Sequence, residues 1–114
     1  MNPYGLITLP WFALGGLLLL FHFWYDYHVQ GNYISAGKRT SNWLLGVHAT
    51  TWTLTVSVPL YLVGTLTVEQ FAMLLITHTA MDWTKCHRLP NTRAYEVLDQ
   101  LVHLVTLAVC LWAW

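Results

Sequence analysis

The chain of 114 residues is 56% apolar and only 9% charged, with five Lys or Arg residues and five Asp or Glu residues. An average soluble domain of this length would carry about 28 charged side chains. The composition therefore excludes a disordered tail, a collagen-like repeat, a basic nucleic-acid-binding protein and a disulfide scaffold. We expect a small membrane protein that crosses the bilayer several times.

Four stretches approach the roughly 20 apolar residues that a membrane-spanning helix needs. They cover residues 6–29, 43–64, 68–84 and 94–114. We predict an all-α four-helix bundle of two helical hairpins, forming a single transmembrane domain.

Capping signals mark where three of these helices begin. Thr67 and Gln70 have the spacing of a capping box before the third helix. Ser41–Asn42 and Asn91–Thr92 are candidate N-caps for the second and fourth. Two prolines fall near helix ends, Pro10 at the start of the first helix and Pro59 late in the second.

The five basic residues predict the orientation. Lys38 and Arg39 lie in the first loop, and Lys85, Arg88 and Arg93 lie in or beside the third. The positive-inside rule places both loops in the cytoplasm and both termini on the outer side, in a multi-pass protein.

The Trp residues agree with this orientation, because aromatic side chains favour the two membrane interfaces. Near the predicted boundaries lie Trp43 and Trp83 on the inner side and Trp11, Trp112 and Trp114 on the outer side. Trp24 and Trp52 lie deeper, and we interpret them as packing residues.

Seven ionisable side chains lie inside the predicted spans, where they are costly and tend to be functional. They are His22, Asp26, His48, His78, Asp82, Asp99 and His103. Three His/Asp pairs are four residues apart, which puts both members on one face of a helix. With a rise of about 1.5 Å per residue, the four His lie at one depth and the three Asp at a shallower one. We predict one site in the cytoplasmic half of the bundle.

Imidazole and carboxylate groups together favour a divalent metal ion at this site. Three carboxylates in low dielectric would take up protons unless a cation lies between them. The predicted ligands are His22, Asp26, His78, Asp82 and His103, with Zn²⁺ as the first choice and Mn²⁺ or Fe²⁺ as alternatives. His48 and Asp99 remain as candidate catalytic groups.

Interhelical ion pairs are the competing interpretation of the same residues. Asp82 could reach Lys85 or Arg88, and Asp26 or Asp99 could pair with Arg93 or Lys38. In that case the polar side chains would hold the helices together and bind nothing.

Four ordered motifs between residues 22 and 103 resemble a family of small polytopic membrane proteins from bacteria and their phages, domain of unknown function 3307. The motifs are His22 to Asp26 and Gln30, then Lys38, Asn42–Trp43 and His48, then His78 to Asp82 and Lys85, then Asp99–Gln100 with His103. The resemblance implies a bacterial cytoplasmic membrane and adds Gln30, Lys85 and Gln100 as polar candidates. It implies no established activity, and the likeness in style to small membrane proteins described as metal-dependent hydrolases is analogy.

Three functions fit these patterns. The first is a metal-dependent hydrolase acting on a lipid or lipid-linked substrate, with His48 or a free Asp as general base and Lys85, Arg88 and Arg93 attracting phosphate. The second is metal or proton transport, against which the nearly charge-free outer halves of the helices count. The third is a phage accessory protein for lysis or exclusion with structural His/Asp pairs. Gly15–Gly16 leaves a homo-oligomer open.

Overall fold

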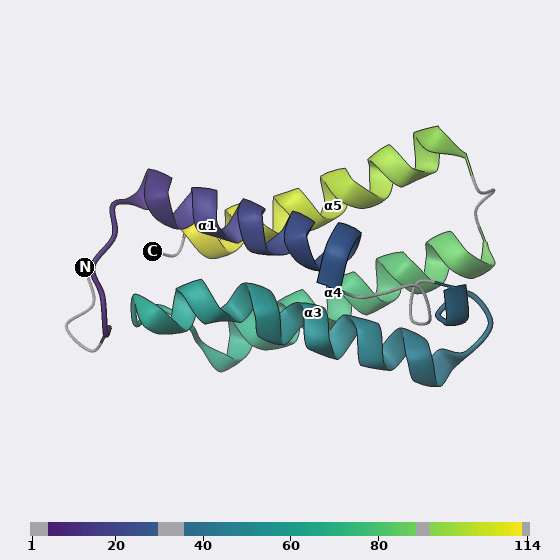
Figure 1. Ribbon diagram of the computed structural model, residues 1–114, viewed down its shortest axis with the longest axis horizontal. Helices are drawn as coiled ribbons and strands as arrows, with labels where there is room; N and C mark the ends of the chain where they lie inside the picture. Colours follow the sequence, from purple (N-terminus) through teal and green to yellow (C-terminus); the bar gives the residue numbers. More distant parts are fainter. Residues whose placement is uncertain (1–4, 30–35, 89–91, 113–114) are drawn as a thin grey trace.

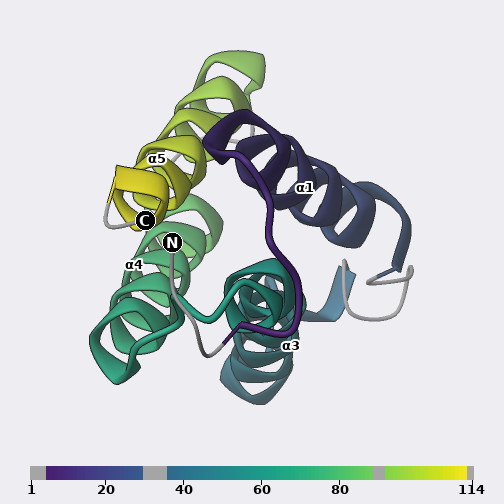
Figure 2. The ribbon, with the colours of Figure 1, turned by 90° about the vertical axis from the view of Figure 1, so that its left-hand side faces the viewer.

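Four helices run up and down along one axis of the computed structural model, which describes residues 5–29, 36–88 and 92–112 (Figure 1). The elements are α1 (Trp11–Trp24), the π-helical turn η1 (Tyr25–Val29), α3 (Asn42–Leu62), α4 (Val68–His87) and α5 (Arg93–Trp112). Seen along the axis, each long helix packs against two others, in the order α1, α3, α4, α5 (Figure 2). The predicted all-α four-helix fold is confirmed for these residues.

The predicted caps explain where α3 and α4 begin. The Ser41 hydroxyl accepts a hydrogen bond from the Leu44 amide at 3.3 Å. Thr67 and Gln70 form the full capping box: the Gln70 amide donates to the Thr67 hydroxyl at 3.1 Å, and the Thr67 amide donates to Gln70 Oε1 at 2.9 Å. Asn91 lies outside the described residues, and α5 begins directly after Thr92.

The first helix differs from the prediction at its start. It begins at Trp11 and not at residue 6, because the residue before a proline is disfavoured in helical geometry and Pro10 therefore occupies the N-cap position. Between α3 and α4, Gly64 adopts a φ of 78°, the left-handed conformation that glycine takes after a helix end.

The end of the first helix widens into the π-helical turn η1 at Tyr25. Such turns add a residue to the helical repeat and are frequent at functional sites. Here Tyr25 is buried, the side chain of Asp26 is only 9% exposed, and Tyr27 lines a cavity against α5. In the π turn, three consecutive side chains thus lie either in the interior of the bundle or at a cavity beside it.

Polar and apolar side chains are distributed in the reverse of a water-soluble bundle. Six His and Asp side chains are at most 3% exposed: His22, His48, His78, Asp82, Asp99 and His103. Many large apolar side chains are more than half exposed, among them Trp11, Trp43, Leu54, Ile76, Val105 and Trp112. Trp52 is fully buried as predicted, whereas the packing role predicted for Trp24 is wrong because that residue is 49% exposed.

Among the described helices, α5 alone is long and apolar enough to cross a membrane. α1 has only 14 residues before the π turn, and the Thr, His and Asp residues of α3 and α4 lower the hydropathy of those helices. The four-span topology therefore stays a prediction.

The two ends of the bundle differ in charge. The start of α3, the end of α4 and the start of α5 lie together at one end (Figure 1), and all five basic residues lie in or beside these segments. The turn between α3 and α4 and the end of α5 lie at the other end. The core of that half is apolar and includes Leu14, Leu18, Val56, Leu60, Leu74 and Leu107.

Candidate metal centre

Three helices bring imidazole rings to the carboxylate of Asp82. His48 Nε2 from α3 lies 2.9 Å from Asp82 Oδ2, and His78 Nε2, one turn before Asp82 on α4, lies 3.3 Å from the same oxygen. His103 Nε2 from α5 lies 3.5 Å from Asp82 Oδ1. His48 Nε2 and His78 Nε2 are 2.9 Å apart. Side chains 55 residues apart in the chain thus meet at one buried point.

Two further carboxylates lie at the edges of this group. Asp99 Oδ1 is 2.8 Å from His103 Nε2, and Asp26 Oδ1 is 3.7 Å from His48 Nε2. The six side chains, His48, His78, His103, Asp26, Asp82 and Asp99, are called the His/Asp cluster below. The cluster contains the two predicted catalytic residues and four of the five predicted metal ligands.

The fifth predicted ligand, His22, has both ring nitrogens engaged within the protein. Trp52 Nε1 donates to His22 Nδ1 at 2.9 Å, so the ring hydrogen is on Nε2, which lies 2.8 Å from Gln100 Oε1 and donates to it. His22 is accordingly in neither group of potential metal ligands among the described residues. Its geometry is that of a residue that orients the neighbouring rings.

Trp52 also contacts the cluster directly. Its ring stacks on His78 with a centroid separation of 4.1 Å and an interplanar angle of 16°. Sequence reasoning gave Trp52 a packing role only, although its spacing of four residues from His48 places both on one face of α3.

Two lysines pair with the cluster, and the partners differ from those predicted. Lys38 Nζ lies 3.6 Å from Asp82 Oδ2, and Lys85 Nζ lies 3.2 Å from Asp99 Oδ2. Burial lowers the pKa of Lys85, which lies beyond the predicted span, but the carboxylates of Asp99 and Asp82 together raise it above its ordinary value. The Lys85 ammonium therefore stays charged.

The cluster offers two overlapping sets of metal ligands. Asp26, His48 and His78 form one, and His78, Asp82 and His103 form the other; within each set the ligand atoms lie within 4.8 Å of one another. Two imidazoles and one carboxylate are a ligand set that catalytic zinc sites use, with the fourth position open.

Several buried atoms of the cluster also lack a hydrogen bond of good geometry. Asp82 Oδ2 and His103 Nε2 have close neighbours but no hydrogen-bond partner among the described residues. Imidazole nitrogens and carboxylate oxygens, the atom types that bind divalent ions, thus surround one small space. The residues present therefore fit a divalent ion.

A small cavity of about 170 Å³ adjoins the cluster at the basic end of the bundle. Its lining includes the carboxylates Asp26, Asp82 and Asp99 as well as Lys38 and Lys85. A volume of this size holds several water molecules, each of which takes about 30 Å³ in the liquid. The cluster can thus be reached by water from this end.

Two of the three polar candidates implied by the family resemblance lie at the site. Lys85 and Gln100 are at the site, Gln100 through its contact with His22 and a 3.4 Å hydrogen bond from its amide to Asp99 Oδ2. Gln30 lies outside the described residues.

Comparison with known proteins identifies the family. The sequence model of a family described as proteins of unknown function (DUF3307) matches residues 15–114. No curated protein and no solved structure matches the chain. Because the match covers most of the sequence and every residue of the His/Asp cluster, this protein belongs to the DUF3307 family.

Proposed function

We propose that this protein is a multi-pass membrane protein that binds a divalent metal ion in the His/Asp cluster and hydrolyses an ester bond there. The observation that carries the proposal is the convergence of three imidazole nitrogens, within 2.9 to 3.5 Å, on the buried carboxylate of Asp82. Buried groups of this kind in a polar and water-accessible position are a frequent mark of a functional site.

The membrane location is supported by what the bundle exposes. Large apolar side chains lie on its outside while the ionisable ones lie inside, as expected when lipid surrounds the helices. The basic residues gather at one end, which supports a cytoplasmic position for that end and an outer position for the turn between α3 and α4.

Charge balance supports a cation in the cluster. Within the cluster itself, leaving out Arg39, Arg93 and Glu96 of the adjoining cavities, three carboxylates face two lysine ammonium groups, so one negative charge remains while the imidazoles are neutral. A divalent ion offsets this charge, and a single proton on one imidazole is the alternative. Zn²⁺ is the first choice for His78, Asp82 and His103, with Mn²⁺ or Fe²⁺ as alternatives.

The cluster residues outside this ligand set suit general base catalysis. A bound divalent ion would lower the pKa of a nearby water molecule. Asp99 is better placed than His48 to act as the base, because it lines the water-accessible cavity and His48 does not. Asp99 would take a proton from water, and the water oxygen would bond to the carbon or phosphorus of the ester as the ester C–O or P–O bond breaks. The protonated Asp99 would then return this proton to the leaving alkoxide.

Transport receives less support from the same geometry. Among the described residues, no buried His, Asp, Glu, Lys or Arg lies outside the cluster and His22. A metal ion or proton would therefore meet no buried ionisable side chain of the described residues between the cluster and the opposite end of the bundle, where Ser57 and Thr106 are among the buried polar residues.

A structural cluster is the second candidate, and the two lysine pairs favour it. Lys38 with Asp82 and Lys85 with Asp99 join separate segments of the bundle. In such a protein, the ion pairs and one protonated imidazole would neutralise the three carboxylates. The cluster would then stabilise the fold of an accessory membrane protein that acts through its partners.

The proposal is tested with purified protein on fluorogenic carboxylic and phosphoric esters in micelles, with and without added Zn²⁺, Mn²⁺ or Fe²⁺. We expect hydrolysis that a chelator abolishes and the metal restores. Asp99→Asn should keep the metal and lose about 10²-fold or more of the rate, whereas His87→Ala, an exposed histidine outside the cluster, should match wild type. Metal-independent or absent hydrolysis of both ester classes would overturn the enzymatic assignment.

A further inference from the structure

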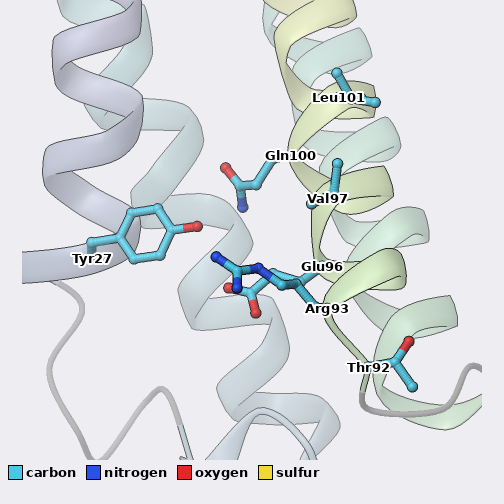
Figure 3. A pocket seen from close by; sticks show the side chains of 7 residues that line it. All are labelled: Tyr27, Thr92, Arg93, Glu96, Val97, Gln100 and Leu101. Atoms are coloured by element: carbon cyan, nitrogen blue, oxygen red, sulfur yellow. The ribbon is translucent and has the colours of Figure 1, made fainter.

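A larger cavity of about 560 Å³ lies between η1 and the first half of α5. Figure 3 shows Tyr27 on η1 facing Gln100 and Arg93 on α5 across this space. Tyr27, Glu96 and Gln100 line both this cavity and the smaller one beside the cluster. The larger cavity is therefore next to the route by which water reaches the site.

The lining changes from polar to apolar along α5. Thr92 and Arg93 lie at the basic end of the bundle, and Val97 and Leu101 follow toward the middle. An apolar groove of about 370 Å³ continues along the contact of α1 and α5, lined among others by Leu104, Leu107 and Leu111 of α5. On α5, Leu101 and Leu104 are separated by about 4.5 Å of helix rise, so the linings of the two spaces follow one another there. On the side of α1 the linings end at Leu19 and resume at Tyr27, about 12 Å further along.

The glycine pair of α1 leaves the apolar groove open. Gly15 and Gly16 both line it, and a Cβ added at Gly16 would meet no atom within 4 Å. A larger side chain at Gly16 would therefore extend into the groove without displacing the packing of the bundle. This position provides a means of filling the groove selectively.

The net charge of the two polar cavities at the basic end depends on whether a cation is bound in the cluster. The cavity beside the cluster is lined by three bases, Lys38, Arg39 and Lys85, and by the acids Asp26, Asp82, Glu96 and Asp99. With Arg93 of the adjoining cavity the charges balance, and a divalent ion would make the region positive. An anion is then favoured at this end, next to an apolar groove.

We infer that this composite groove binds one anionic phospholipid, with its phosphate at Arg93 and the cavity beside the cluster and an acyl chain along the contact of α1 and α5. The inference rests on the proposed function, for which the lipid is the substrate. A headgroup near Arg93 has its ester bonds on the side of the water-accessible cavity, whereas the acyl chain keeps to the apolar groove.

The test uses the full-length protein, metal-loaded and metal-stripped, in micelles doped with phosphatidylglycerol or phosphatidylcholine of identical acyl chains. Native mass spectrometry counts the lipids retained per chain, and elemental analysis of the same samples counts the metal. Gly16→Leu fills the groove, and Gly46→Leu is its matched control because a Cβ there also meets nothing within 4 Å while Gly46 lines a different cavity, on α3. Arg93→Gln removes the proposed phosphate contact. Arg88, which was also predicted to attract phosphate, instead contacts the ring of Trp83 and lines neither cavity, so Arg88→Gln is the control.

We expect metal-loaded wild type to retain phosphatidylglycerol in preference to phosphatidylcholine. Arg93→Gln should weaken retention about fivefold, the value of one basic residue near an anionic lipid. Gly16→Leu should also weaken retention, both controls should match wild type, and Glu96→Gln should strengthen retention. Removing the metal should reduce the preference for the anionic lipid.

The inference is overturned if Gly16→Leu and Gly46→Leu retain lipid equally, or if the two lipids are retained equally. It is also overturned if soluble glycerol phosphate competes fully and Gly16→Leu has no effect, because the site would then bind phosphate and not a lipid. Bound metal without selective lipid retention would refute the lipid site and leave the proposed metal-dependent hydrolysis unaffected. Lipid retention that Gly16→Leu lowers and Gly46→Leu does not, in a protein without bound metal, would support the groove and refute the proposed function.

Discussion

Lys38 and Lys85 determine how much negative charge the His/Asp cluster leaves for a cation. Each lies within 3.6 Å of a cluster carboxylate, and their side chains are only 14% and 17% exposed. A lysine at this distance both stabilises the carboxylate and competes with a metal ion for it. The effect of removing one lysine therefore differs between a metal site and a structural ion-pair cluster.

Lys85→Gln should destabilise the metal-free protein by about 1 to 3 kcal/mol, because Asp99 loses its charged partner in a partly buried position. The same substitution should tighten divalent metal binding, since the cluster gains one unit of negative charge. Thermal unfolding in detergent and competition with a metal-sensitive dye measure the two effects. Arg88→Gln is the control, because Arg88 contacts the ring of Trp83. Loss of stability with no gain in metal affinity would favour the structural interpretation.

Much of the site could be predicted from residue type and spacing. His78 with Asp82 and Asp99 with His103 meet as the four-residue spacing predicted. The role of His22 could not be predicted, because it depends on hydrogen bonds from Trp52 and Gln100, which are on other helices. The lysine partners were also wrong, since the loop geometry that brings Lys38 to Asp82 leaves no pattern in the sequence.

At the level of single helices, the ends were predictable where a side chain caps them. Ser41 and the Thr67–Gln70 pair cap α3 and α4 as expected. The π turn at Tyr25 was not predicted, because such turns are rare and have no composition signal comparable to a cap. The π turn follows His22 and contains Asp26, so this irregular segment of the helix supplies one residue of the cluster.

Thr67→Ala should lower the free energy of unfolding by about 0.5 to 2 kcal/mol, because the first turn of α4 loses the acceptor for the Gln70 amide. Metal content and lipid retention should stay at wild-type levels, since the cap lies at the end of α4 opposite to Asp82. Thermal unfolding and elemental analysis of the same preparation check both statements. A parallel loss of metal would mean that the cluster depends on helix stability in general.

For the whole molecule, the reversed distribution of polar side chains matters more than the hydropathy of any one helix. The residues that make α4 less apolar include Gln70, His78 and Asp82, all of which face the interior. Composition alone therefore underestimates how apolar the outer face of the helix is. This is a physical reason why the proposed four-span topology is compatible with only one described helix that is conspicuously apolar.

The proposed topology predicts which ends an impermeant thiol reagent can reach. With Cys86 and Cys110 replaced by Ser, a cysteine at Thr65, in the turn between α3 and α4, should react in intact cells with an accessible outer face. A cysteine at Arg39 should react only after permeabilisation. Mass-tag gel shifts measure both reactions, and labelling of the Arg39 position in intact cells would refute the orientation.

The central claim is that His78, Asp82 and His103 bind a divalent ion, and the metal content of the purified protein tests it most directly. Elemental mass spectrometry at neutral pH should find close to one divalent ion per chain in wild type and in the control His87→Ala. His78→Ala and Asp82→Ala should lose it while retaining the helical content of wild type. A folded wild-type protein that takes up no stoichiometric metal, even after incubation with Zn²⁺, Mn²⁺ and Fe²⁺, would contradict the claim.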